Sequence, residues 1–253
     1  MHSGFNLSIS KSDWNKERFE LRLQQGNKLY SAQRKGFEQG LDGFRDKDGK
    51  ISARLLRTSN FPLVEGAEIF ISHSHKDRDL AIAIAGALDT EFGIKSFIDS
   101  CFWSDFRALQ LEIDTEYSIH HKEANGDLIF SYEKANVASS HVFMLLTSAL
   151  TEMIDSASYV FFLNTPNSIV LDEDVTETES PWIYMEILMT RLIRRKLTKT
   201  FSEKAVQKAI ENKLEVRYDV DVSHLIDLTA GDFFELLKLQ TKTDFLNSLR
   251  NWT

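Results

Sequence analysis

The chain has 253 residues, of which 42% are hydrophobic and 27% are charged, and its formal net charge is −8. These values are ordinary for a soluble globular protein and leave room for one large domain or for one domain with an extension. Because phosphate backbones bind basic surfaces, the negative charge argues against general nucleic-acid binding.

Cysteine content and apolar runs predict the compartment. Cys101 is the only cysteine, so no intramolecular disulfide can form, which fits the reducing cytosol. The residues after Met1 lack the basic-then-apolar pattern of a signal peptide. The longest apolar runs are far shorter than the ~18 residues needed to cross a bilayer. We therefore expect a soluble, cytoplasmic protein that does not enter the membrane.

The first part of the chain, residues 1–62, is expected to form a mainly helical extension. Residues 11–41 read as helical, although their apolar side chains are spread around the helical wheel and glycines weaken the pattern. Residues 42–50 resemble a calcium loop. Phe44 and Leu55 would occupy its first and last ligand positions, and neither can bind calcium. We interpret this segment as a surface turn.

After Pro62 the pattern changes to alternating strands and helices, judged by short apolar runs and by helical periodicity. Strands are expected at 67–72, 95–98 and 159–163, with strand-like pieces at 214–218 and 223–228. Helices are expected at 76–92 (capped by Gly93), 105–117, 133–157, 181–197, 202–212 and 231–250. This alternation predicts an α/β domain over residues 66–252. Its parallel sheet would have about four or five strands and helices on both faces.

In such sheets the ligand crevice lies at the carboxyl ends of the strands. The residues that follow the predicted strands are therefore the ones expected near a ligand: Ser72, His73, Ser74, Asp99, Ser100, Asn164 and Thr165.

The most informative side chain is the carboxylate of Glu186, which lies in an apolar helical stretch. Trp182 precedes it by four residues, so the two side chains share one face of the helix. A carboxylate among apolar neighbours is costly without a compensating partner. Glu186 is therefore a candidate for the chemistry of a site.

Three pieces in chain order resemble the Toll/interleukin-1 receptor (TIR) domain. Phe70–Asp77 resembles its first box, where the first strand turns into the first helix. Ile98–Ser100 resembles the end of its second strand. Trp182 and Glu186 match the Trp-x-x-x-Glu spacing of bacterial TIR enzymes that cleave NAD. The resemblance covers residues 66–252 and implies a flavodoxin-like fold, although no clear fourth strand can be placed before the last helix.

The resemblance implies cleavage of the nicotinamide–ribose bond of NAD, which would be a substrate and not a cofactor. Nicotinamide leaves as a neutral base, and the ribose becomes an oxocarbenium-like cation in the transition state. One carboxylate, Glu186, could hydrogen-bond the ribose hydroxyls and stabilise this charge. Backbone amides at 72–75 could receive phosphate oxygens. The substrate-binding residues implied are Phe70, Ser72, His73, Ser74, Asp99, Trp103 and Trp182.

The fate of the ribosyl cation stays open among ADP-ribose, a cyclic isomer and a base-exchange conjugate. Bacterial TIR proteins of this size resemble the sensor-synthases of Thoeris-type antiphage systems. The resemblance therefore implies self-association through TIR contacts, a phage-derived trigger and a downstream effector that senses the product.

Each candidate residue also has a structural interpretation. Glu186 could pair with an arginine of its own helix: Arg191, Arg194 or Arg195. Asp99 could cap the next segment, Phe70 could face the core, and Cys101 is expected to be a half-buried loop thiol. His73 and His75 suggest a metal pair, but no second ligand cluster has suitable spacing, so no metal is expected. The acidic loop 172–179 is expected to point away from an anionic substrate.

Two other functions remain as alternatives. A non-catalytic TIR interaction module would act as an adaptor and would not need Glu186. An enzyme similar to nucleoside deoxyribosyltransferases would use a glutamate as nucleophile on free deoxynucleosides.

Overall fold

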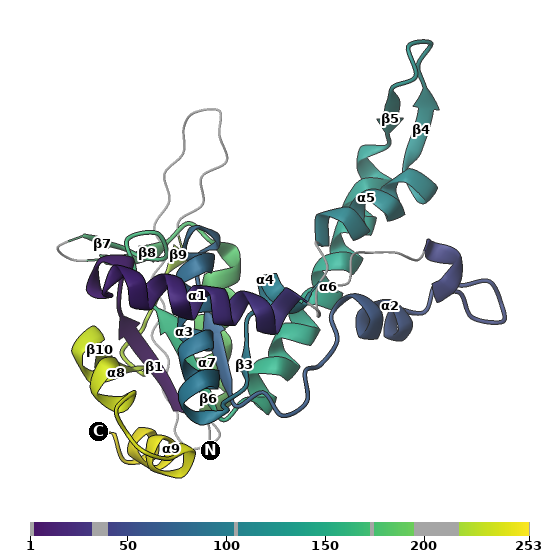
Figure 1. Cartoon of the computed structure of the whole chain (residues 1–253). Coiled ribbons are helices and arrows are strands. Elements are labelled where there is room, and N and C mark those ends of the chain that lie inside the picture. Colours follow the sequence, from purple (N-terminus) through teal and green to yellow (C-terminus); the bar gives the residue numbers. More distant parts are fainter. Residues whose placement is uncertain (1–2, 32–39, 104–105, 173–174, 195–217, 253) are drawn as a thin grey trace. The chain divides into compact units, whose positions relative to one another are not determined.

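The computed structural model of the chain divides into two compact units. It describes residues 3–31, 40–103, 106–172, 175–194 and 218–252 (Figure 1). The first unit comprises Met1–Asn27, Gly66–Ser96 and Ile154–Thr253, and the second comprises Lys28–Glu65 and Phe97–Met153. The chain therefore passes between the units several times, and each unit is built from segments that are distant in the sequence.

The main sheet has five parallel strands in the order β10-β1-β6-β2-β3. Its strands are β1 (Ser3–Ser8), β2 (Ile69–Ser72), β3 (Ser96–Phe97), β6 (Tyr159–Leu163) and β10 (Ile226–Thr229). All residues of β2 and β6 are buried, because helices cover both faces of the sheet. The sheet and its helices follow the α/β pattern that the sequence predicts.

The strand order has a simple relation to the flavodoxin-like order 2-1-3-4-5. When β2 is counted as the first strand, β3, β2 and β6 take the places 2, 1 and 3. The N-terminal strand β1 then occupies the fourth place, and β10 the fifth. The fourth strand that the sequence pattern leaves unplaced is therefore supplied by the start of the chain.

This position of β1 corrects the predicted boundary at residue 62. Phe5 and Leu7 of β1 are fully buried, and the strand pairs with β6 on one side and β10 on the other. Residues 1–62 therefore do not form an extension separate from the α/β domain. The beginning of this segment completes the main sheet, and Lys28–Glu65 belongs to the second unit.

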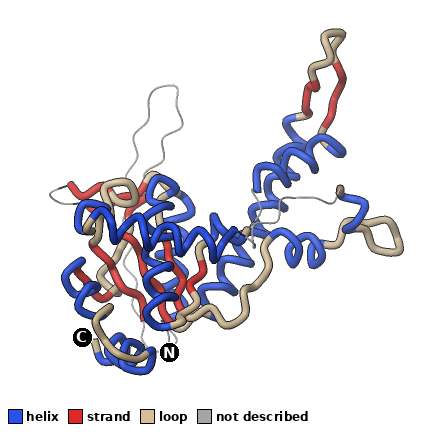
Figure 2. The backbone as a smooth tube through the Cα atoms, in the orientation of Figure 1, coloured by secondary structure: helices blue, strands red, loops and turns tan. Residues whose placement is uncertain are grey.

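Helices of the first unit connect or cover the strands (Figure 2). They are α1 (Lys16–Ser31, whose last four residues fall in the second unit), α3 (Arg78–Phe92, after the short helix η3, His75–Asp77), α7 (Pro181–Arg194), α8 (Ala230–Leu236) and α9 (Lys242–Asn251). Gly93 ends α3 in the left-handed region, with φ 63°, as predicted. The single helix expected at 231–250 is instead two helices, because Thr241 begins a new one by accepting a hydrogen bond from the amide of Asp244.

Helices α1 and α3 cross at two glycines. A Cβ atom on Gly86 would lie 2.2 Å from the carbonyl oxygen of Arg22, and one on Gly26 would lie 2.2 Å from that of Ile82. The two backbones therefore touch directly. The glycine that weakens the helical pattern at position 26 is required by this packing.

The strands of a small antiparallel sheet lie before and after α7 in the sequence. It consists of β7 (Val170–Asp172), β8 (Val175–Thr178) and β9 (Tyr218–Asp219). The segment 172–179, expected to be an acidic loop, thus contains all of β8 and the last residue of β7. Glu173 and Asp174 of this segment lie outside the described residues, as does the predicted helix 202–212.

The second unit contains the remaining described elements. They are η2 (Leu41–Phe44), α2 (Ala53–Asn60), α4 (Asp99–Phe102), α5 (Phe106–Tyr117), the hairpin β4 (Ile119–Lys122) and β5 (Leu128–Phe130), and most of α6 (Tyr132–Ser156). The tip of this hairpin is a turn in which Gly126 has φ 98°. The segment 42–50 is a surface turn, as expected, and Arg45 ties it to Tyr117 at the end of α5.

Within the described part of the chain, α6 is the one helix whose length and apolar composition would allow it to cross a membrane. The core helices of soluble proteins meet the same criteria, so the finding is weak. The absence of a membrane span stays a prediction.

Candidate functional site

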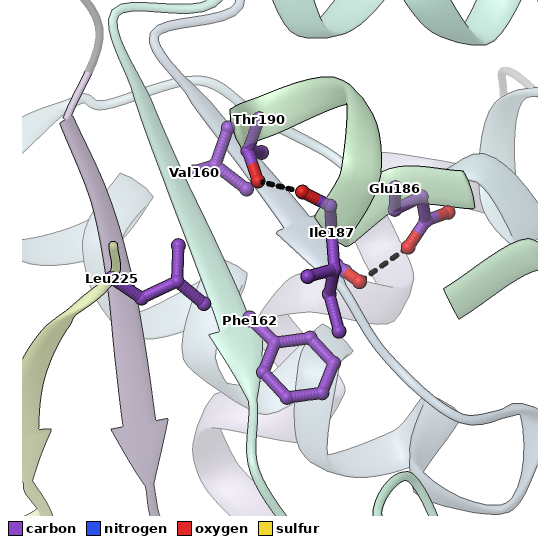
Figure 3. A pocket seen from close by; sticks show the side chains of 7 residues that line it. Val160, Phe162, Glu186, Ile187, Thr190 and Leu225 are labelled. Carbon is purple, nitrogen blue, oxygen red and sulfur yellow. Dashed lines mark hydrogen bonds between the residues drawn. The ribbon is translucent and has the colours of Figure 1, made fainter. Parts of the chain in front are cut away.

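Glu186 lies on α7 and faces the carboxyl end of β2. The helix starts with proline at its first position, which suits a residue without an N–H, and the Ser180 hydroxyl accepts from the amide of Ile183 at 3.3 Å. Glu186 is 5% exposed, and the Ser72 hydroxyl donates a hydrogen bond to its Oε2 atom (Figure 3). The contact joins two residues that are 114 positions apart.

A small, mostly apolar hollow lies between α7 and the sheet at this contact (Figure 3). It leaves almost no room for a water molecule and is lined by Ser72, Val160, Phe162, Glu186, Ile187, Thr190 and Leu225. Its apolar wall continues into a core cluster that includes Ile183 and Val220. Water is largely excluded here, so a positive charge placed beside Glu186 would be attracted more strongly than in bulk solvent.

The contact lies at the switch point of the sheet. From β2 the chain continues to β3 on one side, whereas β6 pairs with β2 on the other. Ligands of open α/β sheets bind outside the carboxyl ends of such a strand pair. The position of Ser72 at the end of β2 therefore places Glu186 where this fold class holds its ligands.

The loops that follow β2 and β6 are joined by the carboxylate of Asp77. It accepts hydrogen bonds from Thr165 Oγ1 at 2.5 Å and from Asn167 Nδ2 at 2.8 Å. Thr165 is itself buried, and its amide donates to the hydroxyl of Ser168 at 2.9 Å. Both loops at the switch point are thus held in one arrangement. Sequence reasoning predicts Thr165 at this edge and misses Asp77 and Asn167 as its partners.

One turn beyond Glu186, Thr190 is buried and contacts the loop before β10. Its Oγ1 lies 2.7 Å from the carbonyl oxygen of Ile187 and 3.0 Å from Nε2 of His224. Nearby, Arg191 pairs with Asp221 at 3.0 Å. A hydrogen bond from the Ser223 hydroxyl, with a smaller contribution from Arg191, lowers the pKa of Asp221. Arg191, one of the partners considered for Glu186, is therefore engaged with a different carboxylate.

The remaining candidates of the first unit surround β2 and α7. Phe70 is fully buried within β2, which agrees with a core role. His73 is 9% exposed, and its Nδ1 atom lies 3.3 Å from the carbonyl oxygen of Ile71. Ser74 precedes η3, and its backbone carbonyl oxygen accepts from the amide of Asp77 at 2.8 Å. Trp182 is half-buried on α7.

Asp99 and Trp103 belong to the second unit, whereas Glu186 belongs to the first. Asp99 is the first residue of α4, and its Oδ1 accepts from the amide of Ser100. Trp103 is 7% exposed, donates its Nε1–H to the carbonyl oxygen of Pro62 at 3.1 Å and packs against Phe61. Trp103 is thus a core residue of its unit.

Cys101 is 1% exposed on α4, more deeply buried than the half-buried thiol expected. Within the described ranges, no group of three histidine, cysteine, aspartate or glutamate side chains could hold a metal ion.

Comparison with known proteins yields no relative from which a function could be transferred. No protein-family model, no curated protein and no solved structure matches this chain.

Proposed function

We propose that the chain is a TIR-type enzyme that cleaves the nicotinamide–ribose bond of NAD, with Glu186 as its catalytic carboxylate. The observation that carries this proposal is the hydrogen bond from Ser72 to the buried Glu186 at the switch point of the sheet. It supports the role because a carboxylate held at that edge can meet a ligand in the fold's usual crevice.

The chemistry needs little more than this carboxylate. As the C–N bond lengthens, nicotinamide takes both bonding electrons and leaves neutral, and positive charge develops on the ribose. Glu186 hydrogen-bonds the ribose hydroxyls and stabilises that charge in the apolar hollow. Water, a group of the same nucleotide or another small molecule then attacks the cation. We propose that the product is a nucleotide signal made in the cytoplasm during antiphage defence.

Substrate entry requires movement. The hollow has almost no room even for a water molecule, whereas typical ligand sites have volumes of ~300–1,000 Å³. We therefore propose that α7 or the loops after β2 and β6 shift when the protein is activated. The bridge from Asp77 to Thr165 and Asn167 is the contact whose opening would widen this edge.

The test is mass spectrometry of NAD incubated with purified, assembled protein, comparing the wild type with Glu186→Gln. We expect nicotinamide and an ADP-ribose product from the wild type and at least a ~100-fold loss in the variant. Glu179→Gln is the matched control, because Glu179 is an exposed glutamate just before α7. Unchanged nicotinamide release in Glu186→Gln would refute the proposal, and a deoxynucleoside panel in the same assay tests transferase activity.

A non-catalytic interaction module is the second candidate, favoured by exposed apolar side chains of the second unit. Leu111 on α5 and Met144 on α6 are 60% and 68% exposed, and a contiguous patch of such side chains would mark an interaction surface. Under this alternative, Leu111→Ser combined with Met144→Ser abolishes biological function, whereas Glu186→Gln preserves it.

A further inference from the structure

The register of the main sheet places four residues in one row across its carboxyl edge. Ser72 of β2 lies beside Phe162 of β6, Phe162 lies beside Asn6 of β1, and Asn6 lies beside Asp227 of β10. Side chains at matched positions of parallel strands point to the same face of the sheet. Ser72 contacts Glu186, so the row lies on the face that α7 covers.

The two ends of this row are polar and its middle is apolar. At one end Ser72 holds the carboxylate of Glu186. At the other end Asn6 Nδ2 donates to Asp227 Oδ1 at 2.8 Å. Phe162 separates them and lines the hollow. Ser72, which holds one carboxylate, and Asp227, which carries the other, are thus about 14 Å apart, three strand spacings of ~4.8 Å.

The pair Asn6 and Asp227 has features of a binding group. Asn6 is 8% exposed, and its Oδ1 has no hydrogen-bond partner within the described part of the chain. A buried, unsatisfied carbonyl destabilises a fold, so stability alone does not account for an asparagine here. Asp227 is exposed, and the amide of Asn6 fixes the orientation of its carboxylate.

We propose that Asp227, oriented by Asn6, binds the second ribose of a dinucleotide whose first ribose lies at Glu186. This proposal rests on the proposed function and names how the substrate is selected. Carboxylates hydrogen-bond ribose hydroxyls in other dinucleotide sites of α/β sheets. Phe162, in the middle of the row, is buried in the core cluster beneath α7, so the ligand reaches both ends of the row only after the movement of α7 proposed above. Asp227 is then a specificity-determining residue, and Asn6 is a positioning residue.

The test compares NAD with nicotinamide mononucleotide, which has the nicotinamide ribose but lacks the second one. In Asp227→Asn we expect KM for NAD to rise roughly 10-fold, the effect of losing a hydrogen bond to a charged group. KM for nicotinamide mononucleotide should stay unchanged. Asp219→Asn, at an exposed aspartate of β9, is the control and should change neither constant.

Asn6→Val separates positioning from a purely structural role. Valine suits a buried strand and removes the unsatisfied carbonyl, so Tm should stay the same or rise. KM for NAD should nevertheless increase, because Asp227 loses its orienting partner. A lower Tm with unchanged KM would show that the pair is only structural.

The two proposals fail differently. If Asp227→Asn changes the kinetics of both substrates equally or of neither, the role of Asp227 is refuted while NAD cleavage stands. If the wild type cleaves neither substrate, the proposed function fails. In that case, calorimetric titration of wild type and Asp227→Asn with ADP-ribose tests the binding role of Asp227. Equal affinity of the two proteins, or no binding by either, would overturn that role.

Discussion

At the residue scale, the Ser72 hydroxyl donates a hydrogen bond that holds Glu186 toward the sheet. Ser72→Ala removes a hydrogen bond to a charged acceptor, so we expect kcat/KM for NAD to fall about 10- to 100-fold without unfolding. The rate of nicotinamide release measures the effect, with circular dichroism confirming the fold. Ser96→Ala, at a buried serine of β3, is the control. Wild-type kinetics in Ser72→Ala would show that Glu186 is oriented by other contacts.

Residue types alone are sufficient to single out Glu186 and Ser72. Glu186 is recognisable as an acid in an apolar helical stretch, and Ser72 because it ends a predicted strand, where α/β sheets hold their ligands. Asn6 and Asp227 are not recognisable in this way, because an isolated asparagine or aspartate is ordinary in a sequence. Their importance follows from pairing between strands whose residues are 221 positions apart.

At the element scale, the start of α8 depends on a capping box between Thr229 and Asp232. Hydrogen bonds from the hydroxyl and the amide of Thr229 lower the pKa of Asp232. The carboxylate therefore stabilises the fold above its unfolded-state pKa of about 3.9, and this stabilisation is lost as pH falls through its lower folded-state pKa.

We accordingly expect Asp232→Ala to lower the free energy of unfolding by about 1 kcal/mol at pH 7. The difference from wild type should shrink as pH falls below about 4. Urea unfolding across pH 3–7 measures it. Glu235→Ala, in the same helix, removes an exposed pair with Lys238 and should cost less than about 0.5 kcal/mol. A difference that does not depend on pH would contradict the role of the charge.

The crossing of α1 and α3 is the second feature of this scale. Gly86→Ala would force a methyl group against the carbonyl of Arg22, so we expect a loss of roughly 1–3 kcal/mol in unfolding free energy, or more if the helices separate. Gly231→Ala is the control in α8, where the nearest atom to a new Cβ lies at an ordinary 3.6 Å. Thermal melts measure Tm for both variants. Equal Tm values would refute direct contact between the backbones of α1 and α3.

At the scale of the whole molecule, the first strand ties the beginning of the chain to segments near its end. Removing Ser3–Ser8 would leave β6 and β10 without their common neighbour. We expect the shortened chain to lose its cooperative thermal transition, because a central strand with fully buried Phe5 and Leu7 is missing. Shortening the exposed hairpin tip at 123–127 is the control and should preserve the transition. A cooperative melt without β1 would restore the boundary expected at residue 62.

The sequence by itself determined the elements whose pattern is long or strongly apolar. Helices α3 and α6 and the strands β2 and β6 agree closely with prediction, because periodicity and strand hydrophobicity are local properties. The α/β class and the carboxylate of Glu186 follow from the same local signals. The six-residue strand β1 does not, because a short segment beside a helical stretch carries too little pattern to show which strands it joins.

Only the tertiary structure decided the rest. It places β1 between β6 and β10, divides the chain into two units, assigns Asp99 and Trp103 to the unit that lacks Glu186, and aligns Asn6 and Asp227 with Ser72. The physical reason is that these features depend on hydrogen bonds and packing between residues far apart in the chain. Such contacts form only when the whole sheet assembles, and the local propensity of a segment does not specify them.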